Sequence, residues 1–216
     1  MSGVSHMRSP SIRLVVEKLA QSRGVRTLFR DLSFAVPAGE TLLLTGPNGT
    51  GKTTLLRTIA GLLSAEHGVI ALEGGDAELS VGEQAHLLGH ANAIKAQLTV
   101  LENARAWAAI LGGAPDVVAT LDALDLTALA SIPAGYLSAG QKRRLGLARL
   151  LVAARPIWLL DEPTVSLDAE NRERVAALVA AHVGGGGLVI AATHLPLGIE
   201  AARTLDLGAE SFNRNA

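Results

Sequence analysis

The sequence of 216 residues contains no cysteine. Disulfide frameworks and thiolate metal sites are therefore excluded, which is typical of a protein in a reducing compartment such as the cytoplasm. A strong excess of either charge is also missing, because the formal net charge is −1 and no Lys/Arg-rich run creates a local basic field. Nucleic acid is accordingly not expected as a partner.

Targeting and membrane-spanning segments are not indicated either. Residues 1–10 lack the apolar core of a signal peptide, and we expect them to form a disordered leader. The longest candidate for a membrane span, residues 175–193, contains His182 and four consecutive glycines at 184–187. Because these glycines would break a spanning helix in its middle, the stretch is interpreted as a helix, a turn and a buried strand.

Strand-like and helix-like segments alternate along the chain. Apolar runs bounded by turn residues predict strands at 12–16, 32–36, 41–45, 69–72, 157–160 and 188–192. Helical periodicity predicts helices at 53–63, 98–111, 116–124, 138–154 and 169–182. This alternation indicates an α/β fold with a mostly parallel sheet, a small β-rich layer near the N-terminus and an inserted helical lobe.

Residues 46–53 read Gly-Pro-Asn-Gly-Thr-Gly-Lys-Thr and directly follow the strand expected at 41–45. They fit the pattern G-x-x-x-x-G-K-[ST] of a phosphate-binding loop between a strand and a helix. Its glycines let backbone N–H groups face phosphate oxygens, while Lys52 reaches the β and γ phosphates and the Thr53 hydroxyl binds Mg²⁺. The candidate ATP-binding residues in this segment are Gly46, Pro47, Asn48, Gly49, Thr50, Gly51, Lys52, Thr53 and Thr54.

Two adjacent acids, Asp161 and Glu162, follow the buried strand expected at 157–160. Neighbouring residues on a strand point in opposite directions, so one carboxylate can hold Mg²⁺ through water while the other faces the attacking water. Taken alone, the pair would equally suit a strand end with solvated charges. Its combination with the phosphate loop favours the catalytic interpretation.

A third motif, Leu-Ser-Ala-Gly-Gln at 137–141, precedes a basic turn at 142–144. Ser138 is a candidate N-cap and Gly140 removes a side chain at the start of the helix, so backbone N–H groups are offered to an anion. An ordinary capped helix with a solvated basic turn is the alternative.

The order of these three motifs, continued by Ser-Leu-Asp at 166–168 and by His194, resembles the ATP-binding cassette (ABC) ATPases over nearly the whole chain. The resemblance implies a P-loop NTPase fold and the cofactors ATP and Mg²⁺. It also implies that Glu162 polarises the attacking water and that His194 senses the γ phosphate, with Lys52 as the third catalytic residue. Thr53 and Asp161 would then serve the metal ion.

In that family two cassettes pack head to tail, so the resemblance implies a homodimer. The signature residues of one copy would contact the ATP held by the other, and Asp168 would lie in the loop that crosses the dimer interface. The signature residues in this sequence are Ser138, Ala139, Gly140 and Gln141. Ala139 replaces a glycine that is usual in the family.

Two positions depart from the family pattern. The aromatic residue that stacks on adenine falls near Arg23, whose guanidinium can also stack on a base, with Phe29 as the fallback. An exposed turn charge is the alternative for Arg23. The glutamine that binds Mg²⁺ aligns with His90, and an imidazole is a poor ligand for an ion that prefers oxygen.

Within the family, Leu-Gly-His at 88–90, the segment 137–144 and Trp158 look like the haem-exporter ATPases of c-type cytochrome maturation. This implies integral membrane transporter subunits as partners and a peripheral position on the cytoplasmic face of the inner membrane. The alternative is the ATPase subunit of another exporter or importer, for a lipid, a lipoprotein or a small solute. A cassette protein that acts on DNA or ribosomes is disfavoured, because such proteins carry two cassettes or long insertions with basic surfaces.

The resemblance also implies a division of the chain. A single domain is expected at residues 11–211. Its RecA-like core and β layer would cover 11–87 and 156–211, and the helical signature subdomain would cover 88–155.

Overall fold

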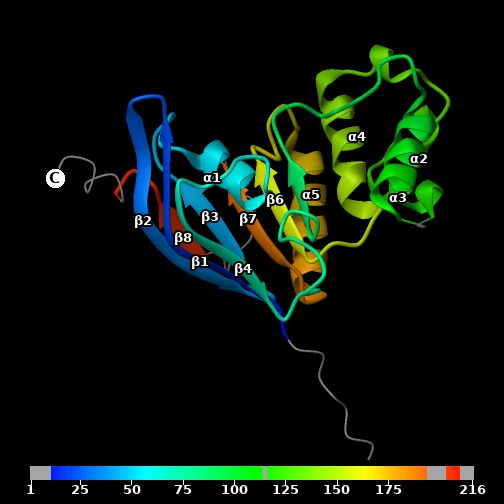
Figure 1. Cartoon of the computed structure of the whole chain (residues 1–216). Helices are drawn as coiled ribbons and strands as arrows, with labels where there is room; N and C mark the ends of the chain where they lie inside the picture. Colours follow the sequence, from blue (N-terminus) through cyan, green and yellow to red (C-terminus); the bar gives the residue numbers. More distant parts are fainter. Residues whose placement is uncertain (1–10, 114–115, 194–202, 210–216) are drawn as a thin grey trace, which may run out of the picture.

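The structure is a computed structural model and describes residues 11–113, 116–193 and 203–209. The leader expected at residues 1–10 lies outside the described residues. In the described part of the chain, helix α1 (Lys52–Ile59) is enclosed between two sheets, and a group of helices stands to one side of them (Figure 1). This arrangement confirms the expected α/β class with a parallel core sheet, an antiparallel layer and a helical lobe.

The central sheet is parallel throughout its described strands. In spatial order it comprises β5 (Ala85–Leu88), β6 (Ile157–Asp161), β7 (Leu188–Ala192), β3 (Thr41–Thr45) and β8 (Arg203–Asp206). Both faces are covered, because successive residues of β6 enter different cores: Leu159 packs toward α1, and Trp158 packs toward α5 (Ala169–Gly184) and the helical lobe. Burial on both faces explains the continuous apolar runs in the sequence.

The antiparallel layer places β1 (Arg13–Arg23) between β2 (Arg26–Pro37) and β4 (His67–Glu73). Both arms of the β1–β2 hairpin are longer than the apolar runs predicted. The pairing shifts register along β1, and Lys18 and Asp31 adopt φ angles of 47° and 53°. Such irregular pairs interrupt the alternation of apolar residues, so the periodicity of the sequence stops short of the true strand ends.

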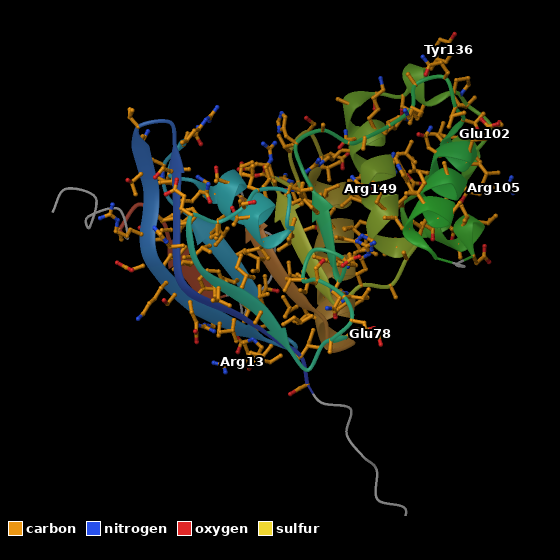
Figure 2. All side chains as sticks on the ribbon, viewed as in Figure 1. Arg13, Glu78, Glu102, Arg105, Tyr136 and Arg149 are labelled. Atoms are coloured by element: carbon orange, nitrogen blue, oxygen red, sulfur yellow. The ribbon has the colours of Figure 1, made fainter. Side chains whose placement is uncertain are left out.

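The helical lobe comprises α2 (Val100–Leu111), α3 (Val117–Ala123) and α4 (Ala139–Leu151), with short 3-10 turns at Thr127–Leu129 and Ala134–Tyr136. Polar caps fix where these helices begin. Thr99 and Glu102 form a reciprocal capping box at α2, and the Asp116 side chain accepts two backbone N–H groups of α3. Glu102 and Arg105 extend from α2 on the outer side of the lobe (Figure 2).

Beyond the β1–β2 hairpin, three further elements differ clearly from the sequence prediction. Helix α1 ends at Ile59 rather than near 63, because Gly61 turns the chain with a φ of 72°. The short strands β5 and β8 were not predicted, since their four residues each are too few to show a period. In the part of the chain that the structure covers, no helix has the length and apolarity that a membrane crossing requires.

His86 on β5 is the titratable group that burial perturbs most clearly. Its ring is 3% exposed and its Nε2 lies 2.7 Å from the Ala153 carbonyl oxygen, so the proton of the neutral ring is on Nε2. Burial lowers the pKa of His86 from 6.5 to about 4. Between these values the unfolded chain binds the extra proton and the folded chain does not, so stability rises with pH across this window.

We therefore expect the free energy of unfolding to fall by up to about 3 kcal/mol as His86 becomes protonated in the unfolded chain between pH 7 and pH 4. Urea unfolding at several pH values measures this slope. His86→Gln keeps an N–H donor but does not titrate, so its slope should be flatter. Burial also lowers the pKa of His182, which leaves a smaller slope of the same sign in the variant. An unchanged slope in His86→Gln would contradict this account of the pH dependence.

Candidate functional site

The phosphate loop connects β3 to α1 and owes its shape to its glycines. Gly46, Gly49 and Gly51 have φ angles of 116°, 80° and 108°, a region that residues with a Cβ rarely adopt. A Cβ on Gly46 would lie 2.8 Å from the backbone nitrogen of Gly208, so there is also no space for a side chain. The predicted strand, loop and helix are thus found in the expected order.

Lys52 is the first residue of α1, and its ammonium group lies inside the curve of the loop. It donates hydrogen bonds to the carbonyl oxygens of Gly46 (2.6 Å) and Pro47 (3.1 Å), and the residue is only 9% exposed. A buried positive charge held at the N-terminus of a helix is suited to bind phosphate.

Thr53 and Asp161 are 108 positions apart in the sequence but adjacent in the structure. The Thr53 hydroxyl donates to Asp161 Oδ2 at 2.9 Å. Asp161 is the last residue of β6 and is 8% exposed, whereas Thr53 is exposed. Parallel pairing of β6 beside β7, which itself pairs with β3, brings the acid to the same edge of the sheet as the loop. The two predicted metal-binding side chains therefore meet, and both offer oxygen.

Glu162 follows directly in an unusual backbone conformation. Its φ of 50° is left-handed, which costs a residue with a side chain about 1–3 kcal/mol. Its N–H donates to the Ala192 carbonyl oxygen at 2.8 Å, so the chain turns while still attached to β7. Glu162 thus leaves the regular strand geometry of Asp161, and the predicted division of roles between the two acids stays a prediction.

One open cavity of about 410 Å³ joins these groups. Its lining includes loop residues, both acids and three arginines; the lining residues are Arg23, Arg26, Leu28, Asn48, Gly49, Gly51, Lys52, Thr53, Thr54, Arg57, His90, Asp161 and Glu162.

Arg23, the candidate adenine partner, is exposed at the tip of the β1–β2 hairpin and lines this cavity. Phe29 is 1% exposed and packs beneath Gly51, so it has no free ring face for a base. His90 lies exposed at the cavity edge.

The signature residues lie at the start of α4 and are not among the residues that line this cavity. Ser138 is the N-cap, as predicted: its backbone N–H donates to Gln141 Oε1 (2.8 Å), and Gln141 N–H donates to Ser138 Oγ (3.2 Å). Gly140 approaches the Ser166 carbonyl oxygen so closely that a Cβ would lie 3.1 Å from it. Within one chain, the structure does not bring this motif to the phosphate loop.

Asp168 is the exposed N-cap of α5, where its carboxylate accepts hydrogen bonds from the backbone N–H and the side chain of Asn171. These bonds hold the pKa of Asp168 below its usual value. His194, predicted to sense the γ phosphate, lies outside the described residues. The role of Asp168 at a dimer interface and the role of His194 at the γ phosphate therefore stay predictions.

Three arginines at or near the site were not identified from the sequence. Arg26 and Arg57 line the cavity, and only the folding of the hairpin over the loop brings Arg26 there. Arg143 lies behind Asp161 and Glu162 with 2% of its surface exposed. Burial lowers the pKa of Arg143, while the two carboxylates raise it. A guanidinium nevertheless keeps its charge in proteins, so a fixed positive charge stands behind both acids.

A phosphate loop at the carboxyl edge of a parallel sheet, with an acid pair at the same edge on β6, which is separated from β3 by β7, defines a P-loop nucleoside triphosphatase. The sequence profile of the family described as ABC transporter matches residues 29–165. The chain belongs to the ABC transporter family, as one of its ATP-hydrolysing components. This confirms the family resemblance and the expected use of ATP.

Individual relatives extend the match over nearly the whole chain. The cytochrome c biogenesis ATP-binding export protein CcmA of Rhodopseudomonas palustris (strain BisB5) is 54% identical over 87% of this chain and 94% of its own length. The protein of the same name from Nitrobacter winogradskyi is 51% identical over 91% of this chain and 98% of its own. Among solved structures, a putative ABC transporter ATP-binding protein of Pyrococcus furiosus superposes with a TM-score of 0.79 at 25% identity, covering 91% and 98% of the two chains.

Proposed function

We propose that this chain is the ATPase subunit of a haem exporter complex in c-type cytochrome biogenesis, and that it couples ATP hydrolysis to haem export or to release of a haem-loaded chaperone. The observation that carries the proposal is the identity of about half of all aligned residues to named cytochrome c biogenesis export proteins over nearly their full length. If the similarity came only from the general ABC motifs, the sequence match would not extend through the helical lobe and the last strand.

The local chemistry supports Mg-ATP as the substrate. Lys52 and the backbone N–H groups of the loop would hold the phosphates, and the Thr53 hydroxyl with the Asp161 carboxylate would hold Mg²⁺, which would supply positive charge to neutralise the phosphates. Among the described residues no cluster of three or more His, Cys, Asp or Glu side chains forms a metal cage, and two oxygen ligands beside a phosphate suit this ion. Glu162 would accept a proton from the attacking water.

A homodimer is part of the proposal, because the signature residues of this chain do not line the cavity of its own phosphate loop. The start of α4 is exposed at Ser138, and Tyr136 just before it is 84% exposed at the outer end of the lobe (Figure 2). A second copy packed head to tail would receive this surface over its own bound ATP. Asp168, at the start of α5, would then lie in the same interface.

Integral membrane subunits would bind at the groove between the core and the helical lobe. A cavity of about 520 Å³ lies there beside His90, and Leu62 on its rim is 65% exposed. An exposed leucine at a concave surface suits a segment of a partner protein. The subunit would thus be peripheral, on the cytoplasmic face of the inner membrane.

Deleting the gene is expected to abolish covalently attached haem in the c-type cytochromes of the host, because nothing else would supply the ATP-driven step. Haem staining of denaturing gels measures this loss. A plasmid copy of the wild type should restore the stain, and the matched Glu162→Gln copy should not. Normal cytochromes in the deletion strain would contradict the haem pathway and favour an exporter or importer of another cargo.

A further inference from the structure

Arg143, on the second turn of the signature helix α4, uses every hydrogen-bond donor of its guanidinium. Its five bonds go to the carbonyl oxygens of Asp161 (2.8 Å), Glu162 (2.7 Å), Pro163 (3.2 Å) and Gly89 (2.9 Å), and to Asn92 Oδ1 (3.0 Å). A guanidinium carries five N–H groups in a fixed plane. The side chain is therefore fully satisfied and has no freedom to choose other partners.

The two edges of this planar group hold two different segments. Nη2 and Nε bind the backbone at 161–163, which contains the proposed general base Glu162, whereas Nη1 binds the segment 89–92, which contains His90. Both segments are far from α4 in the sequence. Because the guanidinium is rigid and 2% exposed, a shift of any of these three segments must be followed by the other two.

The backbone at Glu162 needs such support. Its left-handed φ of 50° is strained, and its N–H is held by β7 through Ala192. On the other side, the carbonyl of Glu162 itself is held by Arg143. The direction of the Glu162 carboxylate thus depends on a bond that comes from the signature helix.

A second contact fixes the same junction. Gly146, one turn further along α4, packs directly on Asn92, and a Cβ at this glycine would lie 2.9 Å from Asn92 Oδ1. The same amide oxygen accepts the hydrogen bond from Arg143. The segment 89–92 is therefore tied to α4 both by packing and by the guanidinium.

We propose that Arg143 is a positioning residue for ATP hydrolysis, which makes the orientation of Glu162 depend on the placement of the signature helix and of the segment around His90. The inference rests on the proposed catalytic cycle but not on its cargo. In that cycle the signature helix contacts the ATP of the second copy, and the segment 89–92 borders the groove proposed for the membrane subunit. Arg143 would let the carboxylate take its working position only when both contacts are made.

Arg143→Lys tests the proposal in the full-length chain. Lysine keeps the charge, but its single ammonium has three donors and does not span both segments. We expect kcat for ATP hydrolysis to fall about 100-fold while the Kd for Mg-ATP, measured by calorimetry, stays the same, because misplacement by about 1 Å costs this much in rate. Arg143→Gln should show at least the same loss where it folds.

The matched control is Arg144→Lys. Arg144 is the next residue on α4 and also donates hydrogen bonds to carbonyl oxygens, but these belong to Leu124 and Asp125 within the helical lobe. Its kcat should stay near the wild-type value. If Arg143 had only a structural role, Arg143→Lys would instead lower both the midpoint of thermal unfolding and the affinity for Mg-ATP.

A double variant gives the second readout. If Arg143 acts through the Glu162 carboxylate, adding Arg143→Lys to Glu162→Gln should not slow the residual turnover any further. An unchanged kcat in Arg143→Lys, or a full additional loss in the double variant, would overturn the proposal. If the wild-type chain hydrolyses no ATP, the proposed function is overturned as well. If the wild type hydrolyses ATP and Arg143→Lys has the same kcat, only the role of Arg143 is overturned.

Discussion

Glu162→Gln is expected to lower kcat for ATP hydrolysis about 1,000-fold, because glutamine has the shape of glutamate but does not accept a proton from water. The affinity for Mg-ATP should stay close to the wild-type value, since the groups that hold the phosphates are unchanged. Phosphate release at saturating ATP measures the rate, and calorimetry measures the affinity.

The matched control for this variant is Glu170→Gln. Glu170 is an acid on the first turn of α5 whose side chain is 81% exposed and pairs only loosely with Arg174, at 3.5 Å. Its removal should leave the rate unchanged. Turnover by Glu162→Gln at nearly the wild-type rate would refute the assignment of the catalytic carboxylate.

Lys52→Ala is expected to weaken binding of Mg-ATP by at least about 100-fold, because each charge-assisted hydrogen bond to a phosphate contributes about 1.5–3 kcal/mol. The ammonium already lies inside the loop, against the carbonyl oxygens of Gly46 and Pro47. Little rearrangement would therefore be needed for it to meet a phosphate group. Calorimetric titration measures the change in Kd.

Lys95→Ala is the control for this loss, since Lys95 is an exposed lysine that does not line the cavity of the phosphate loop. It should bind Mg-ATP as the wild type does. Wild-type affinity in a correctly folded Lys52→Ala variant would show that the phosphates are held elsewhere.

The sequence predicted the structure around the candidate site well where the geometry is local. The phosphate loop is set by its own glycines and by the strand and helix that adjoin it, so a short motif carries the whole arrangement. Asp161 could be predicted for a similar reason, because a buried strand ends at it. Its contact with Thr53 then follows from parallel pairing, which the alternating strands and helices already indicated.

Features that depend on distant contacts could not be predicted. The five partners of Arg143 lie between 18 and 54 positions away in the sequence, and nothing in the basic turn at 142–144 distinguishes this residue from Arg144. The strands β5 and β8 exist because longer neighbours provide the pairing. The lowered pKa of His86 likewise comes from burial against other segments rather than from its own neighbours in the sequence.

The arrangement at α4 connects the proposed dimer to catalysis. The signature residues cap the start of the helix, and Arg143 on its next turn holds the backbone of Glu162. Closure of a second copy on the signature end would thus act directly on Glu162, the proposed general base. ATP would bind the closed dimer more tightly than the separate copies. This difference in affinity would drive the closure that completes the active site.

The molar mass of the Glu162→Gln variant in solution, measured by light scattering with and without Mg-ATP, tests the central claim that two copies enclose the nucleotide. The account predicts a monomer without nucleotide, a dimer of twice that mass with Mg-ATP, and a return to monomer with Mg-ADP. A variant that binds Mg-ATP with full occupancy and yet stays monomeric at every protein concentration would contradict it.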